Sequence, residues 1–123
     1  MPSEKPEQRL EDMLENIGRI RAYVQDRTRE EYLGDTMVQD AVERCFERIT
    51  EAARKIGDRF DSDHPEAGFP NLREFGSVLR HDYDRVNPVL MWAFTQDRLD
   101  ILESTVHRIL AGFSQEETGV SET

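Results

Sequence analysis

The sequence predicts an all-α protein, a bundle of four to five helices. Apolar residues recur at the three-four spacing of an amphipathic helix along most of the chain, and no segment alternates with the period of two that is typical of a strand. Helix-starting signals, such as Asn87 followed by Pro88, separate the apolar stripes. One long connection, at positions 57–70, carries two prolines and two glycines and divides the chain.

The first helix is expected from about Pro6 to Gln25. Seven apolar residues form a single stripe there: Leu10, Met13, Leu14, Ile17, Ile20, Tyr23 and Val24. The segment that follows, DRTREEYLGD, breaks this stripe. We expect it to hold a short helical turn with Tyr32 and Leu33.

A second long helix is expected to begin near Asp35 or Thr36, because Thr36 and Gln39 have the spacing of a capping box. It carries the most regular stripe of the sequence: Val38, Ala41, Val42, Cys45, Phe46, Ile49, Ala52, Ala53 and Ile56. Cys45 lies inside this stripe, which favours a small core residue over a reactive thiol. As the only cysteine, it excludes an intrachain disulfide and a cysteine-based zinc site.

The third helix is expected to start at Asn71, with Glu74 at the capping-box position, and to end close to Tyr83. Its apolar residues are Leu72, Phe75, Val78 and Leu79. Asn87 and Pro88 then begin a fourth helix, which contains Val89, Leu90, Trp92 and Phe94. A continuation or a fifth helix holds Leu99, Leu102, Val106, Ile109, Leu110 and Phe113. We expect one helical domain over residues 1–113, followed by a disordered tail at 114–123 without apolar periodicity.

Composition limits the classes of function. Hydrophobic residues make up 37% of the 123 positions and charged residues 34%, so the core is thin and a partner or second copy is expected to complete it. The formal charge of -10 argues against non-specific DNA coating, which requires a basic face, although a local basic cleft is compatible with it. The first residues, MPSEKPEQRLED, do not resemble a signal peptide, and no stretch is apolar enough for a membrane span. We therefore expect a cytoplasmic protein that does not enter a membrane.

The stretch LRHDYDRVNP, at positions 79–88, groups side chains suited to chemistry at a phosphate. His81 lies near a predicted helix C-terminus, where the helix dipole favours a cation, and histidine is the usual general acid–base catalyst near neutral pH. Arg80 adds a planar fork of donors that fits phosphate oxygens. Neighbouring residues of a helix point about 100° apart, so these two are expected to flank a substrate, with the Tyr83 hydroxyl nearby.

The same stretch has a simpler interpretation. Asp82 and Asp84 can pair with Arg80 and Arg85 as a solvated charge cluster at a helix end. Arg73, two turns earlier, either extends a phosphate-facing strip or is an ordinary exposed helix arginine. From the residue types alone, both interpretations stay open.

Other kinds of site find no support in the sequence. The three histidines, His64, His81 and His107, are far apart, and no helix carries the His-Glu-x-x-His pattern of zinc enzymes. The chain has no glycine-rich phosphate loop and no Gly-x-Ser-x-Gly elbow. We therefore expect neither a metal ion nor a cofactor.

The segment GSVLRHDYDRVNPVLMW, at positions 76–92, resembles the signature of the HepT-like toxins of the HEPN superfamily. The residues that fall in register are Gly76, Leu79, Arg80, His81, Tyr83, Asp84, Val86, Asn87 and Trp92. LEDMLENIGRIRAYV is similar to the first helix of that family, DAVERCFERITEAARKI to its second, and HPEAGFPNLREFGSVLRH to the lead-in to its active helix. The resemblance covers about residues 8–112.

The resemblance implies a HEPN-type bundle that dimerises through its signature helices, or forms a larger homo-oligomer. It also implies a metal-independent endoribonuclease that is the toxin of a toxin–antitoxin system. Arg80 and His81 would be the catalytic pair at a cleft shared by two copies. Arg73, Ser77 and Arg85 are expected to contact the RNA substrate.

The partner that the resemblance implies is a minimal nucleotidyltransferase antitoxin. In the family, such a partner binds the toxin and attaches AMP to the tyrosine of the signature, which corresponds to Tyr83 here. AMP at this position would add bulk and negative charge beside the cleft and repel the RNA backbone.

Two departures from the family pattern leave an alternative open. The broader motif has an arginine four to six residues ahead of the histidine, whereas positions 74–77 read Glu-Phe-Gly-Ser here. Ser77 also stands where asparagine is usual in the closer branch. The alternative is a non-catalytic HEPN module that docks a nucleotidyltransferase partner.

Overall fold

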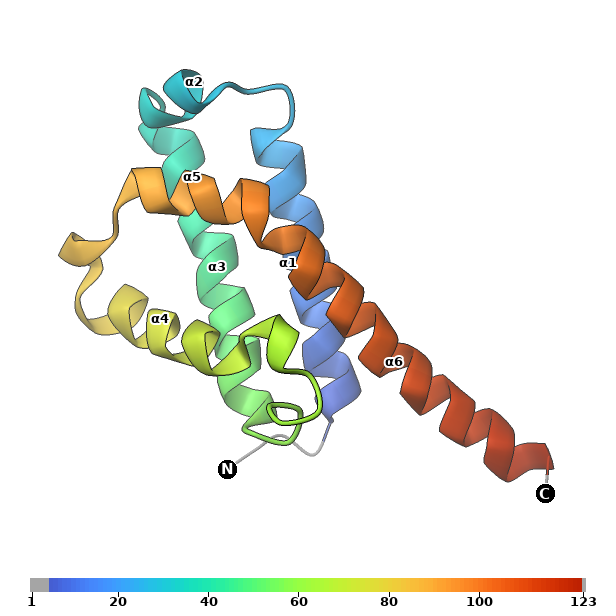
Figure 1. Cartoon of the computed structure of the whole chain (residues 1–123). Helices are drawn as coiled ribbons and strands as arrows, with labels where there is room; N and C mark the ends of the chain where they lie inside the picture. Colours follow the sequence, from blue (N-terminus) through green and yellow to red (C-terminus); the bar gives the residue numbers. More distant parts are fainter. Residues whose placement is uncertain (1–4, 123) are drawn as a thin grey trace.

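The computed structural model describes residues 5–122, apart from the side chains of Tyr83 and of residues 115–122. This part contains six α-helices and two 3₁₀ turns without a strand, which confirms the predicted all-α class (Figure 1). The α-helices are α1 (Pro6–Val24), α2 (Arg29–Leu33), α3 (Thr36–Ile56), α4 (Phe69–His81), α5 (Pro88–Asp97) and α6 (Leu99–Glu122), and the 3₁₀ turns are η1 (Pro65–Ala67) and η2 (Tyr83–Arg85). Within the described residues, no helix is both long and apolar enough to span a lipid bilayer.

The two long helices α1 and α3 lie side by side and antiparallel at the centre of the bundle (Figure 1). Their predicted stripes are buried between them, α4 packs on α3, and α6 packs on α1. Cys45 is 1% exposed and belongs to this core, as predicted. Burial raises the pKa of its thiol, so it remains protonated and unreactive.

The start of α3 differs in detail from the prediction. Asp35 is the residue that caps the helix, because its carboxylate accepts a hydrogen bond from the backbone N–H of Val38 at 3.2 Å. The predicted capping box of Thr36 with Gln39 is therefore wrong. The Gln39 amide instead donates to two backbone carbonyls at the end of α2, which ties that short helix to α3.

The start of α4 also differs from the prediction. The helix begins at Phe69, two residues before Asn71, because Gly68 takes the left-handed conformation (φ 68°) that turns the chain into the helix. Phe69 is fully buried and anchors the first turn, in which Pro70 is tolerated because the N–H it lacks would be unpaired there. The helix ends at His81, so the predicted site residues after it lie outside α4.

The short helix α2 confirms the turn predicted around Tyr32 and Leu33. A capping box of Thr28 and Glu31 begins it, and Tyr32 is fully buried against Trp92 of α5, with ring centroids 5.3 Å apart. The Tyr32 hydroxyl has no hydrogen-bond partner among the described residues. Burial, with a smaller contribution from the nearby Glu43 carboxylate, raises the pKa of Tyr32 to about 12.

The last two helices follow the signature segment. α5 begins as predicted, with the Asn87 side chain accepting from the backbone N–H of Val89 at 2.9 Å. The helix is interrupted at Arg98, the C-cap of α5, and α6 starts at the next residue. The backbone of α6 is helical as far as Glu122, where we expected a disordered tail from residue 114, and this end projects from the bundle (Figure 1). The side chains of residues 115–122 lie outside the described ones, so the domain end at 113 stays a prediction.

Candidate active site

The last two turns of α4 carry three exposed residues of the predicted site, Ser77, Arg80 and His81. The other side of the helix is buried through residues at the three-four spacing: Phe69, Leu72, Gly76 and Leu79. This amphipathic pattern fixes the rotation of α4 on the bundle. It keeps the polar residues near the C-terminal end of the helix accessible from outside.

Gly76 allows α4 to approach α3 closely. A Cβ atom at this position would lie 2.8 Å from both Cβ and Oγ1 of Thr50, and 3.2 Å from Nη1 of Arg80. Distances this short to a backbone-anchored Cβ cannot be relieved by turning a side chain. The missing side chain of Gly76 is therefore what sets the spacing of the two helices beside Arg80.

We expect Gly76→Ala to destabilise the protein by about 1–3 kcal/mol, because the new methyl group overpacks the contact with Thr50. Thermal unfolding followed by circular dichroism would measure this loss. Gly18→Ala is the matched control, because a Cβ on Gly18 meets nothing within 4 Å and alanine is the better helix former. An equal or higher melting temperature for Gly76→Ala than for the wild type would contradict the close approach.

Arg80 directs its guanidinium back along α4 toward the Gly76 contact and toward α3. Its Nη1 lies 3.7 Å from Oε2 of Glu51, and the Glu51 carboxylate also accepts hydrogen bonds from Arg54. The hydrogen bonds from Arg54 lower the pKa of Glu51, and the charges of Arg54 and Arg80 lower it further. Arg54 lies 3.1 Å from the Glu51 carboxylate and Arg80 3.7 Å, so the ion pair of Arg80 is the looser of the two.

His81 is the last residue of α4, and its side chain is exposed. The helix closes at Asp82, whose backbone N–H donates to the carbonyl of Val78 at 2.8 Å. Among the described residues, His81 has no hydrogen bond or ion pair that would occupy its ring nitrogens. An accessible imidazole at a helix C-terminus, beside a loosely held arginine, has the components needed for proton transfer at a phosphate.

Arg73 does not join this group. Its Nη1 donates to the backbone carbonyl of Gly57 at 2.8 Å and to Asp61 at 3.2 Å, and its Nη2 pairs with the same carboxylate. The side chains of Arg73 and Asp61 are 24% and 22% exposed. Arg73 thus holds the connection between α3 and α4, although its sequence position suggested an RNA contact.

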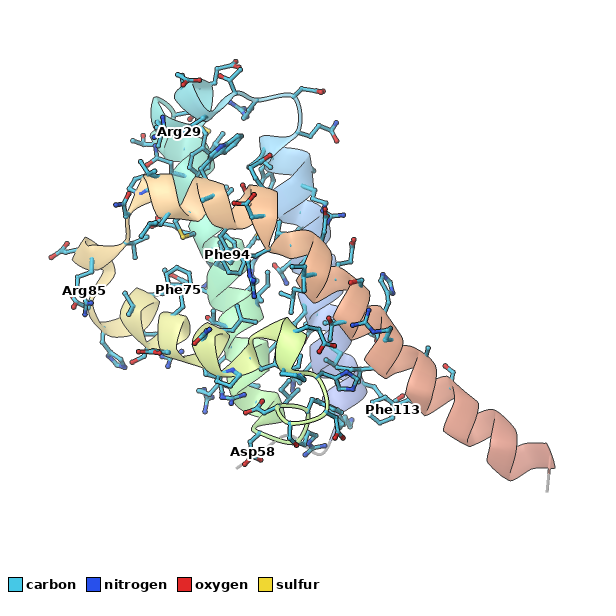
Figure 2. All side chains as sticks on the ribbon, in the orientation of Figure 1. Arg29, Asp58, Phe75, Arg85, Phe94 and Phe113 are labelled. Atoms are coloured by element: carbon cyan, nitrogen blue, oxygen red, sulfur yellow. The ribbon has the colours of Figure 1, made fainter. Side chains whose placement is uncertain are left out.

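The remaining predicted residues lie at or beyond the end of α4. Arg85, in η2, pairs with Asp82 at 3.4 Å in the exposed charge cluster that the sequence suggested, and Figure 2 shows it at the connection between α4 and α5. The exposed hydroxyl of Ser77 has no hydrogen-bond partner among the described residues. Tyr83 begins η2, two residues after His81, but its side chain lies outside the described residues. The roles of Ser77, Tyr83 and Arg85 stay predictions.

A polar pocket that the sequence did not reveal opens beside Arg80. It has a volume of about 450 Å³ and lies between α1, α3 and α4, with Gly76 and Arg80 in its wall. Arg48 and Lys55 of α3 also line it, two helical turns apart. Their spacing of seven residues was visible in the sequence, but nothing there indicated that α4 would bring Arg80 to the same pocket.

No group of three or more histidine, cysteine or acidic side chains in the described part of the chain is arranged to hold a metal ion. His64 faces Glu66 at 3.6 Å in the connection before α4, and His107 is exposed on α6. The expectation that the protein needs no metal stays a prediction.

Comparison with known proteins assigns the chain to a family. The family model described as "Ribonuclease HepT-like" matches residues 13–109, which include α4, the exposed histidine and α5. The chain belongs to the HepT-like ribonuclease family. The resemblance seen in the sequence is thereby confirmed.

Relatives of this HepT-like chain carry related names. A protein of Methanocaldococcus jannaschii named as the RNase MJ0127 is 30% identical over 92 residues, which cover 75% of this chain and 76% of the relative. A protein of Thermococcus cleftensis named as ribonuclease HepT is 28% identical over 100 residues, covering 81% and 91%. Another M. jannaschii protein, named as the RNase MJ1380, is 25% identical over 97 residues, covering 79% and 89%. No solved structure matches the chain.

Proposed function

We propose that this HepT-like protein is a metal-independent endoribonuclease and the toxin component of a toxin–antitoxin pair. The observation that carries the proposal is the exposed His81 at the C-terminal end of α4, next to an arginine that is only loosely paired. Membership of a ribonuclease family supports RNA as the substrate. In this proposal Arg80 takes the role of the missing upstream arginine, since its Nη1 lies 3.2 Å from the place that a Cβ atom of Gly76, five residues before His81, would occupy.

The reaction that suits these groups uses the 2′-OH of the RNA itself as the nucleophile. The 2′ oxygen attacks the adjacent phosphorus while the bond from phosphorus to the 5′ oxygen breaks. One imidazole accepts the proton of the 2′-OH, and a second donor returns a proton to the departing 5′ oxygen. Arg80 stabilises the charge on the phosphorane, and the products are a 2′,3′-cyclic phosphate and a 5′-OH end.

A second copy of the chain would supply the second imidazole. We expect α5 to form the interface with this second copy. Positions 88–96 read PVLMWAFTQ and contain no charged residue, although 34% of the chain is charged. Leu90 on this helix is 67% exposed and lines a groove of about 470 Å³, whose wall also includes Phe75 of α4 and Phe94 of α5. An apolar groove with an exposed leucine at its edge fits a self-complementary interface between two copies.

The proposed dimer can be tested through the oligomeric state of the protein in solution. Wild-type protein is expected to run as a dimer or larger species at micromolar concentration in light scattering, and Leu90→Glu is expected to shift it toward the monomer of 14.3 kDa. The reason is that a carboxylate would be buried without a partner. Met37→Glu is the matched control, because Met37 is 79% exposed on α3 and lines neither groove nor pocket. A wild-type protein that is entirely monomeric would contradict the shared cleft.

Silencing by a minimal nucleotidyltransferase fits the position of Tyr83. The residue follows His81 by two positions in the chain, at the start of η2. AMP attached to its hydroxyl would add a phosphate to the same connection. The added negative charge would repel the RNA backbone. The acidic balance of the rest of the chain suits a basic or neutral partner surface.

The test is cleavage of end-labelled RNA by purified protein in the presence of EDTA. Cleavage that survives EDTA and leaves 2′,3′-cyclic phosphate ends is the expected result. No cleavage, by protein that is folded and shown by mass spectrometry to be unmodified at Tyr83, would favour the alternative. The protein would then be a non-catalytic module that docks a nucleotidyltransferase, and the lack of arginine at positions 74–77 favours that reading.

A further inference from the structure

The pocket between α1, α3 and α4 differs in charge from the rest of the molecule. The whole chain has 26 acidic and 16 basic residues, whereas the pocket lining has four acidic and five basic residues. The basic residues come from all three helices: Arg9, Arg44, Arg48, Lys55 and Arg80. A concave site that gathers cations on an acidic protein focuses positive potential at one place.

The two carboxylates that α1 contributes to the pocket are already paired. Asp12 lies 3.3 Å from Nη1 of Arg9, and Glu15 lies 3.2 Å from Nη2 of Arg19, one turn further along the helix. Each carboxylate therefore has a guanidinium on its own helix. Among the described residues, neither forms an ion pair with a cation of α3.

The two carboxylates from α3 are paired as well. Glu47 lies 2.7 Å from Nη1 of Arg44, and Glu51 accepts hydrogen bonds from the guanidinium of Arg54. Arg54 itself does not line the pocket, so it neutralises Glu51 from outside. All four acidic residues of the lining are thus satisfied by arginines.

Two cations in the lining are left without a carboxylate. Among the described residues, neither Arg48 nor Lys55 forms an ion pair. Arg48 donates a long hydrogen bond of 3.5 Å to the amide oxygen of the buried Asn16 and also interacts with the Cys45 thiol, but neither partner is a carboxylate. The charge of Lys55 contributes to the lowered pKa of Glu51, but it is the smallest of the contributions, and the two side chains form no ion pair among the described residues. Arg48 and Lys55 lie on one face of α3, about 10 Å apart along its axis. Arg80 of α4 lines the same pocket and contacts Glu51, whose position on α3 lies between theirs.

We propose that this pocket is a subsite that holds a phosphate of the RNA chain, through Arg48 and Lys55, next to the phosphate that faces His81. The proposal rests on the ribonuclease function above and extends the RNA path from the end of α4 onto α3. Arg80 belongs to both places, because its guanidinium lines the pocket and its neighbour is His81. Phosphodiester oxygens would provide the anionic partner that Arg48 and Lys55 lack among the described residues.

The experiment measures binding of a fluorescent single-stranded RNA to His81→Ala protein, which is expected to bind without cleaving. Arg48→Gln and Lys55→Gln, each added to that background, are expected to weaken binding about fivefold at 0.1 M salt. Each should also lower the slope of log K against log salt by about 0.7, the value for one lost phosphate contact on a single strand. Arg48→Lys keeps the charge and should keep the slope.

Arg29→Gln in the same background is the matched control. It removes the same charge from α2, at a distance from the pocket lining, and should leave affinity and slope almost unchanged (Figure 2). Circular dichroism of every variant separates a lost contact from a lost fold. Labelled AMP in a parallel titration distinguishes a phosphate within RNA from a phosphate on a free nucleotide.

Equal salt slopes for Arg48→Gln, Lys55→Gln and Arg29→Gln would overturn the subsite and leave the ribonuclease proposal standing. Tight AMP binding that both pocket variants abolish, with RNA binding unchanged, would also overturn it and assign the pocket to a free nucleotide. RNA binding that is absent from all the proteins would refute the subsite as well. The cleavage assay in EDTA decides the ribonuclease function separately, because it uses the wild-type histidine and does not depend on Arg48 or Lys55.

Discussion

His81→Ala is expected to lower the rate of RNA cleavage by about 10²–10⁴-fold, the usual contribution of a positioned general acid or base. The exposed imidazole at the end of α4 has no partner among the described residues, so its removal should cost little stability. The loss should therefore appear in the cleavage rate measured in EDTA, while the melting temperature stays close to that of the wild type.

His107→Ala is the matched control for this experiment. His107 is exposed on α6 and lines none of the pockets beside α4, so its replacement should leave cleavage intact. If His81→Ala cleaved RNA as fast as His107→Ala, the imidazole of His81 would have no part in the chemistry. The end of α4 would then be better explained as a docking surface.

Phe46→Ala is expected to cost about 3–5 kcal/mol of stability, the largest loss we predict for a single replacement. Phe46 is fully buried on α3, and its ring packs in T-shaped arrangements with Phe75 on α4 and Phe94 on α5, with centroids 6.2 Å and 4.9 Å away. Figure 2 shows Phe75 and Phe94 facing the centre of the bundle from their two helices. Removing the shared ring leaves a cavity under the signature segment, and urea unfolding would measure its cost.

Phe113→Ala provides the comparison for the buried phenylalanine. Phe113 is only partly buried, near the point where α6 leaves the bundle, and touches Phe60 with ring centroids 6.3 Å apart. We expect its replacement to cost about 1 kcal/mol, since less apolar surface is lost from the protein interior. Similar losses for the two variants would mean that Phe46 does not join α4 and α5 to the central helices in the way the structure indicates.

Much of the fold was predictable because helices are encoded locally. The apolar stripe of α3 recurs every three or four residues, so its buried face could be read from neighbouring positions. Asn87 and Pro88 predicted the start of α5 correctly, because capping depends only on residues of the first helical turn. The start of α3 was predicted correctly at Thr36, but its cap was assigned to Thr36 instead of Asp35. The start of α4 was placed two residues late, because local spacing alone did not rank the turn at Gly68 above a cap at Asn71.

The candidate site was predictable only in part. The residue types of the signature indicated chemistry at a phosphate, and the structure leaves His81 accessible and Arg80 loosely paired. The partners of Arg73 could not be read from the sequence, because Gly57 and Asp61 come from the preceding connection, which folds back beside α4. Its predicted contact with RNA stays a prediction. A long flexible side chain can reach many neighbours, and its sequence position does not say which one it will meet.

The sequence by itself determined the all-α class, the apolar stripes, the family and the histidine of the signature. Only the tertiary structure decided that Gly76 lets α4 approach Thr50, that Arg80 therefore turns toward α3, and that Arg48 and Lys55 share a pocket with it. The physical reason is the range of the interactions. Periodicity and capping act within a few residues of one helix, whereas the contacts of α4 with α3 join positions that lie far apart in the chain and meet only when the bundle packs.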